Sequence, residues 1–193
     1  MQWKTAKWMV AVGLLCASSL GSTASTYRFN LDPESSSVDA KVAFMGIGNR
    51  KAYFPAMRGK VVLSPERMNE IDLDVSIDAT QLKAEDGLTT GRLKGKDFFY
   101  VAKYPVVRFE GKVLSMTSPT AGTVSGELTA RGVTRPVNLN LSFSAPPAQA
   151  DGKDTIRLTG VTTINRRDFG MTAYSLVVGK KVTITIKTKL VPG

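Results

Sequence analysis

Apolar and polar residues alternate with a period of two along most of the chain after Thr26. The alternation is clearest in five segments: 38–44, 71–77, 124–129, 137–143 and 182–186. This period is typical of a β-strand with one apolar face and one solvated face. Four weaker segments have the same character: 27–31, 58–64, 106–113 and 155–164. The pattern therefore predicts an all-β protein of eight or nine strands.

Two stretches interrupt the alternation. Residues 84–104 lack it, and we expect a short helix around residues 88–93 that ends at Gly95. Pro146 and Pro147 begin a second stretch, which we interpret as a wide hairpin loop because strands resume after it. An antiparallel set of this size either stacks as two sheets or closes into a barrel, and only closure removes the exposed edges. An eight-stranded barrel would be just wide enough to hold side chains or one small ligand.

The first residues follow a different pattern. Lys4 and Lys7 precede an apolar run at residues 8–20, and the small residues Ser22 and Ala24 follow at the spacing that a signal peptidase reads. The run is too short for a transmembrane helix, which needs about 20 residues. We therefore predict a cleavable secretory signal peptide at 1–24 and one mature domain at 25–193, with a retained membrane anchor as the alternative.

The composition removes most catalytic chemistry. The chain has 193 residues with no histidine and a single cysteine, Cys16. Catalytic triads that use histidine, imidazole metal ligands and zinc clusters are therefore excluded. Asp72, Asp74 and Asp78 share one strand face, where paired acids can support hydrolysis or bind Ca²⁺. Because they lie opposite an apolar face, we interpret them as solvated residues, and we expect neither an enzyme, nor a metal, nor a catalytic cofactor.

The chain is basic, with 26 Lys and Arg against 16 Asp and Glu and a formal net charge of +10. These charges are scattered and are not interleaved with aromatic residues, which argues against a nucleic-acid partner. Attraction to an anionic membrane surface would suit a carrier that loads from a bilayer, and this is a hypothesis. A homodimer is compatible with the pattern.

Several sequence blocks, in order across about residues 27–190, resemble those of the YceI-like family. They are LDPESSSV at 31–38, FMG at 44–46, DFF at 97–99, YP at 104–105, GELT at 126–129, RGVTRPV at 131–137 and INRRDFGM at 164–171. The resemblance implies an eight-stranded antiparallel lipocalin-like barrel exported to the periplasm. It also implies a protein that binds or transports a long isoprenoid lipid, of the quinone or polyprenyl type, inside the barrel. A binder of fatty-acyl chains or other amphiphiles with the same fold is the alternative.

The sequence departs from this family at polar positions. Many members have histidines where Ser35, Phe44 and Arg92 stand here, and an Arg-Asp pair where Thr89 and Thr90 stand. The resemblance therefore implies an apolar barrel for the lipid tail more strongly than it implies any particular head group.

An apolar lumen is sufficient to bind such a tail, because burial of each methylene contributes about 0.8 kcal/mol. The alternative is a packed core without a cavity, since alternation does not measure volume. The candidate lipid-binding residues are Val42, Phe44, Leu73, Val75, Ile77, Phe98, Phe99, Phe109, Leu128, Leu139, Leu141, Phe143, Ile164, Phe169, Met171, Ile184 and Ile186. Asn165 and Arg166, from the most polar block, are candidates for head-group contact, with a structural role in a turn as the favoured alternative.

An outer-membrane barrel is a rival class, because it would also have a signal peptide and alternating strands. Such barrels turn their apolar face outward and carry aromatic girdles. Residues 25–193 contain no tryptophan, and the chain ends in Val191, Pro192 and Gly193 rather than in an aromatic residue. We therefore favour a soluble lipid-binding barrel.

Overall fold

The computed structural model describes residues 25–193. The signal peptide expected at 1–24 lies outside the described residues and stays a prediction. The strands are β1 (Tyr27–Leu31), β2 (Ser37–Phe44), β3 (Gly48–Phe54), β4 (Met57–Leu63), β5 (Glu70–Asp78), β6 (Lys83–Ala84), β7 (Val106–Ser118), β8 (Ala121–Ala130), β9 (Val133–Phe143), β10 (Ile156–Asn165) and β11 (Val178–Pro192). The helices are η1 (Pro65–Arg67), η2 (Ala79–Gln81), α1 (Gly87–Lys94), η3 (Pro147–Gln149) and η4 (Arg166–Phe169).

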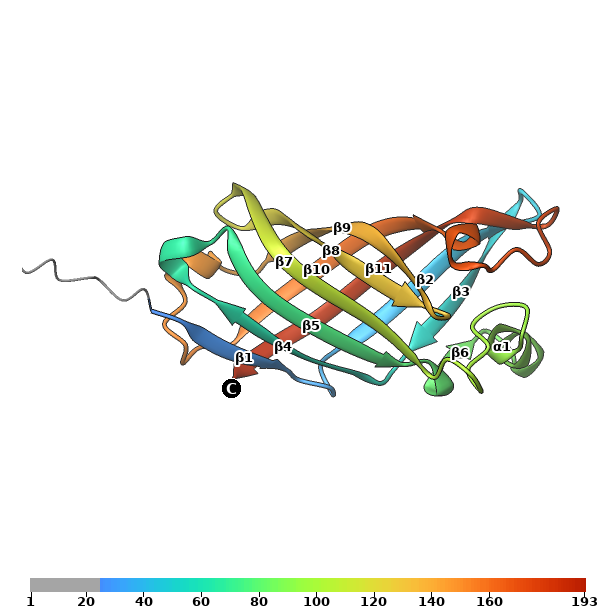
Figure 1. The fold of residues 1–193 in the computed structure, drawn as a ribbon, viewed down its shortest axis with the longest axis horizontal. Helices are drawn as coiled ribbons and strands as arrows, with labels where there is room; N and C mark the ends of the chain where they lie inside the picture. The colour runs from blue at the N-terminus through green and yellow to red at the C-terminus, as the bar shows by residue number, and fades with distance from the viewer. Residues whose placement is uncertain (1–24) are drawn as a thin grey trace, which may run out of the picture.

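The strands close into an antiparallel barrel (Figure 1). The order around the barrel is β1, β4, β5, β7, β8, β9, β10 and β11, and β11 pairs back with β1 to complete the ring. Every pairing is between antiparallel strands. Closure leaves no free edge along this ring, which resolves the choice between two stacked sheets and a barrel.

β2, β3 and β6 lengthen three of the barrel strands beyond a bend. The long strand β11 pairs with β1 near its C-terminal end and with β2 over its first ten residues. In the same way β3 pairs with β2 while β4 pairs with β1, and β6 pairs with β3. Pro33 and Pro55 lie at two of the bends, where a residue without an N–H group is tolerated because the ladder is already interrupted. Eleven strand segments therefore make eight barrel strands.

The alternation in sequence becomes the two faces of the barrel wall. In β5 the side chains of Ile71, Leu73 and Val75 are buried in the interior, and the intervening acidic residues lie on the outer face. The prediction of an eight-stranded antiparallel barrel with one short helix is confirmed. The pattern did not predict β3 or β6. In β3 the first four residues are polar or glycine and only Ala52 and Phe54 are buried, and β6 has only two residues, too few to show a period.

The two non-alternating stretches lie at opposite ends of the barrel (Figure 1). The helix predicted around residues 88–93 is α1, with Asp86 as its N-cap and Gly95 after its last turn. The loop predicted at Pro146 and Pro147 connects β9 to β10 and contains η3, with Pro147 fully buried. None of the helices within residues 25–193 is long and apolar enough to cross a bilayer.

Candidate functional site

The barrel encloses a cavity of about 590 Å³. This volume lies within the range of about 300–1,000 Å³ that small-molecule sites occupy. The wall is built from the inward positions of the barrel strands and is almost entirely aliphatic or aromatic. Several of its side chains, including Val42, Ile164 and Ile184, are only half-buried although they point inward, because no protein atoms fill the space in front of them. The interior is therefore partly vacant, and the alternative of a solid core is wrong.

Sixteen of the seventeen candidate lipid-binding residues line this cavity. Thirteen of them meet because alternate residues of each strand point to the same side of the closed sheet. Phe98, Phe99 and Met171 come from connections between elements. Whether they contact a lipid stays a prediction. The sixteen are Val42, Phe44, Leu73, Val75, Ile77, Phe98, Phe99, Phe109, Leu128, Leu139, Leu141, Phe143, Ile164, Met171, Ile184 and Ile186.

Phe169 and Asn165 require correction, because neither lines the cavity. Phe169 is 1% exposed, but it belongs to η4 and lies beneath a shallow outer groove beside β9. Alternation does not apply in a 3₁₀ turn, so the direction of the Phe169 side chain was not readable from the sequence. Asn165 follows the inward Ile164 by one position and faces outward. Its side chain accepts a hydrogen bond from the Arg167 backbone N–H and donates one to Asp168 Oδ1 at 2.8 Å.

Arg166, the other head-group candidate, does line the cavity and is only 3% exposed. Its guanidinium donates to three backbone carbonyl oxygens, those of Gly179 at 2.9 Å, Val178 at 3.0 Å and Met171. Burial, followed by repulsion from Arg167, holds the pKa of Arg166 below its usual range. The guanidinium thus fixes η4 against the start of β11, which is the structural role favoured from the sequence.

The cavity opens at one end of the barrel. Six of its lining side chains are exposed, and all six lie at that end, in the first half of β3, at the start of and within α1, or in the segment before β11: Arg50, Lys51, Asp86, Leu88, Arg92 and Tyr174. We call residues 44–51, 85–97 and 165–181 the mouth segments. None of the six exposed residues was a candidate, since β3 was not predicted and the other two segments have no periodic pattern.

Side-chain contacts hold the mouth segments together. Arg50 pairs with Glu85 at 2.9 Å and lies 4.7 Å from the centre of the Phe44 ring. Tyr174 stacks on Phe98 with 5.9 Å between ring centres, and the Arg92 guanidinium lies 6.0 Å from the Tyr174 ring. Aromatic and cationic side chains of three separate segments therefore surround one opening.

Of the positions that depart from the family pattern, three line the cavity and two do not. Phe44, Thr89 and Arg92 line the cavity at its mouth. Thr90 is taken up in the local fold, since its hydroxyl accepts from the Ala84 N–H and donates to the Asp86 carbonyl. Ser35 lies away from the cavity and donates to Asp32 at 2.8 Å.

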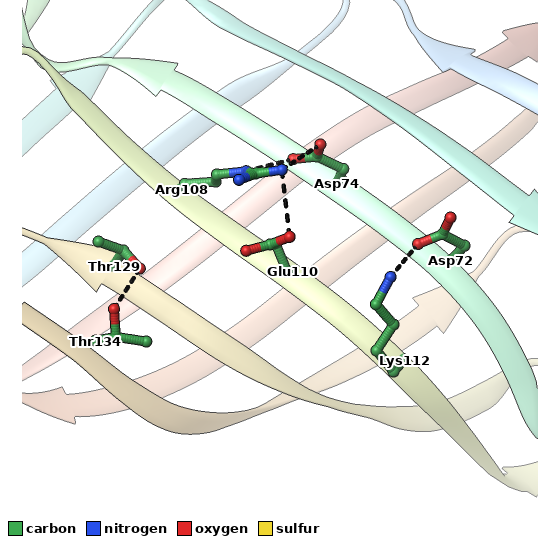
Figure 2. Close-up of polar contacts among 7 residues, drawn as sticks. All are labelled: Asp72, Asp74, Arg108, Glu110, Lys112, Thr129 and Thr134. Carbon is green, nitrogen blue, oxygen red and sulfur yellow. Dashed lines mark hydrogen bonds and ion pairs between the residues drawn. The ribbon is translucent and has the colours of Figure 1, made fainter.

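The acidic residues on β5 form ion pairs on the outer face of the barrel (Figure 2). Asp74 accepts two hydrogen bonds from Arg108, at 2.9 and 2.8 Å, and the same guanidinium contacts Glu110 at 3.2 Å. The hydrogen bonds from Arg108 hold the pKa of Asp74 below its usual range. Lys112 pairs with Asp72. These carboxylates are solvated exterior residues, as their position opposite an apolar face indicated.

A UPF0312 protein from Pseudomonas savastanoi pv. phaseolicola is 24% identical over 162 residues, which cover 84% of each chain. The crystal structure of Burkholderia cenocepacia BcnA has a TM-score of 0.73 at 20% identity and covers 82% of this chain and 98% of that one. A polyisoprenoid binding domain from Saccharophagus degradans, implicated in plant cell wall breakdown, has a TM-score of 0.66 at 15% identity over 86% of this chain and 98% of its own.

These structural likenesses show the same fold. The model of the YceI-like domain matches residues 29–190, which span the barrel from β1 to β11. The chain belongs to the family of YceI-like domains.

Proposed function

We propose that this protein is a periplasmic lipid-binding protein that sequesters or ferries a long isoprenoid chain, of the quinone or polyprenyl type, in the barrel cavity. The single observation that carries the proposal is the vacant, apolar interior of about 590 Å³ with one open end. Each methylene that leaves water for such an interior contributes about 0.8 kcal/mol, so about ten carbons offset the cost of ordering the chain and still give micromolar binding.

Family relationship supports the ligand class. The S. degradans neighbour is described as a polyisoprenoid binding domain, and it shares this fold along nearly its whole length. The expected signal peptide supports the periplasm as the place of action. The proposed role is binding rather than turnover, because the wall of the cavity supplies mainly hydrocarbon contact. The Thr89 hydroxyl and the Asp86 carboxylate, which also line it, are hydrogen-bonded to each other in the N-cap of α1.

A fatty-acyl amphiphile is the second candidate ligand, and one observation favours it. Arg50, Lys51, Arg92 and Arg166 line the cavity near its mouth, against the single carboxylate of Asp86. A chain that ends in a carboxylate would place its charge among these cations while its tail fills the apolar interior.

An outer-membrane barrel fits less well. Such a barrel presents an apolar band to lipid, whereas the outer faces of β5 and β7 carry Asp72, Asp74, Arg108, Glu110 and Lys112. The apolar side chains of β5 point into the cavity.

The proposal is tested by native mass spectrometry of the protein purified from its own periplasm, followed by solvent extraction of the ligand. Ile184→Arg places a charge on the inner wall at a half-buried position. Thr183→Arg is the matched control, because Thr183 is the preceding residue of β11 and faces outward. We expect the control to retain an isoprenoid lipid and Ile184→Arg to lose it.

Leu141→Arg, with Ser142→Arg as its control, repeats the comparison on β9. Circular dichroism establishes that each variant is folded. Folded Ile184→Arg protein that keeps its full lipid content would overturn the proposal, and so would wild-type protein that never contains lipid.

A further inference from the structure

Large apolar side chains project into solvent from the mouth segments. Ile47, in the turn between β2 and β3, is 92% exposed, and Leu176, just before β11, is fully exposed. Leu88 in α1 is 68% exposed and Met45 is 59% exposed. A single exposed apolar residue is normal on a soluble protein, but a group of them around one opening marks an interaction site.

These side chains come from segments that lie side by side at one end of the barrel, on the right in Figure 1. The Met45 N–H donates to the Val177 carbonyl at 2.7 Å, which joins the β2–β3 turn to the segment before β11. Arg131 joins residues 85–97 to residues 165–181, since its guanidinium donates to the carbonyls of Lys96 and Gly170, both at 2.7 Å. The exposed apolar residues therefore surround the entrance to the cavity.

Positive charge gathers at the same end. The mouth segments contain nine Lys and Arg against four Asp and Glu, a net charge of +5. Residues 25–193 as a whole contain 24 Lys and Arg against 16 Asp and Glu, a net charge of +8. More than half of the excess positive charge thus lies in fewer than a quarter of the residues.

We propose that the mouth segments are a docking surface for an anionic lipid bilayer. Ile47, Leu88 and Leu176 enter the interfacial region, where apolar side chains gain by leaving water, and the surrounding lysines and arginines contact the lipid phosphates. The cavity then opens directly onto the membrane, so a lipid chain passes between bilayer and barrel without crossing water. The transfer of lipid between bilayer and barrel rests on the proposed function, whereas the binding of the mouth segments to a bilayer can be tested independently of it.

The charge also distinguishes this occupant from a second copy of the chain. Two mouths facing each other would bring two surfaces of net charge +5 together, which opposes association. An anionic bilayer supplies the complementary charge, and its apolar layer can accept the exposed apolar side chains. Charge complementarity therefore favours the membrane.

Co-sedimentation with vesicles tests this surface. The probes are vesicles of phosphatidylcholine alone and of phosphatidylcholine with phosphatidylglycerol. We expect binding to the vesicles that contain phosphatidylglycerol, with a decrease as salt rises because the contacts to lipid head groups are screened. The double variant Ile47→Ser and Leu176→Ser is expected to weaken binding at least about tenfold, since two apolar side chains no longer enter the interface. Lys180→Glu with Lys181→Glu is expected to weaken it as well.

The matched controls are Val113→Ser and Val161→Ser, exposed apolar residues on β7 and β10 outside the mouth segments, and Lys153→Glu at the opposite end. These controls are expected to bind like the wild type. Equal binding to both kinds of vesicle, or unchanged binding by the two double variants, would overturn the proposal. So would a loss of binding that accompanies dimer formation through the same residues.

The two proposals fail separately. Ile47 and Leu176 do not line the cavity, so their double variant should purify with its full lipid content. Ile184→Arg, which changes the cavity wall, should bind anionic vesicles like the wild type even when it contains no lipid. Vesicle binding that disappears only in Ile184→Arg would place the membrane contact in the cavity and overturn the docking surface.

Discussion

The two ends of the barrel are built from the same strands, but they differ in net charge, in the exposure of cavity-lining residues and in the number of exposed apolar side chains. At the far end, residues 64–70, 117–122 and 144–155 connect the strands, with two basic and four acidic residues and a net charge of −2. The buried Pro147 lines the cavity there, and none of the exposed lining residues lies at this end. The mouth segments carry a net charge of +5 and the six exposed lining residues. Of the described residues that are large, apolar and exposed, none lies in the far-end connections.

This difference shows that the strands form the wall of the cavity, whereas the segments at each end of the barrel determine where the cavity opens. Register and alternation make an apolar interior along the whole length of the barrel. Whether an end is plugged or open depends on which non-alternating segment lies across it.

The first prediction concerns the buried guanidinium of the mouth end. Arg166→Met should lower the free energy of unfolding by about 3 kcal/mol or more, because the carbonyls of Met171, Val178 and Gly179 lose their donor inside the protein. Urea denaturation followed by circular dichroism measures this change. Arg167→Met is the control, since Arg167 is the exposed neighbour in the same turn and a surface change costs at most about 0.5 kcal/mol. Similar losses of unfolding free energy in the two variants would contradict the role of Arg166 in fixing η4 against the start of β11.

The second prediction applies the same truncation to both ends. Leu114 is 2% exposed and lines the cavity near the far end, so Leu114→Ala should cost about 2–5 kcal/mol of unfolding free energy. Leu88 lines the mouth but is mostly exposed, and Leu88→Ala should change stability by less than about 0.5 kcal/mol. Thermal or urea unfolding compares the pair. A large loss for Leu88→Ala would mean that α1 packs as part of the core.

The third and smallest prediction concerns acid. Hydrogen bonds from the Thr89 backbone N–H and hydroxyl hold the pKa of Asp86 below its usual range. A carboxylate with a lowered pKa stabilises the folded state above its unfolded pKa, and this contribution is lost as the pH falls through the lowered value. The helix cap of α1 should therefore weaken in acid, below about pH 4.

Amide hydrogen exchange in α1, compared near neutral pH and at about pH 3, measures this effect. Asp86→Asn keeps an oxygen that caps the helix but does not titrate, so its α1 amides should lose less protection in acid than those of the wild type. Identical losses in the two proteins would show that the cap does not respond to pH.

Much of the barrel was predictable because its wall obeys a simple period. Burial of alternate residues in β5 and β9 requires no knowledge of what lies opposite, and so Leu73 and Leu139 could be assigned to the interior from their own strands. β3 escaped detection, since its first four residues extend beyond the main ring where neither face is covered. Asn165 and Phe169 were misplaced at the point where a strand becomes a 3₁₀ turn and the period ends.

Local composition and a period of two were enough to predict most of the strands, the inward face, the short helix and the absence of histidine and thiol side chains from residues 25–193. The tertiary structure alone established that the interior is partly vacant, since the enclosed volume depends on how eight strands close and not on any one of them. It also decided that Arg50, Arg92 and Tyr174, distant in sequence, share one entrance. Connections have no period, so their positions are fixed by the contacts that they make across the end of the barrel.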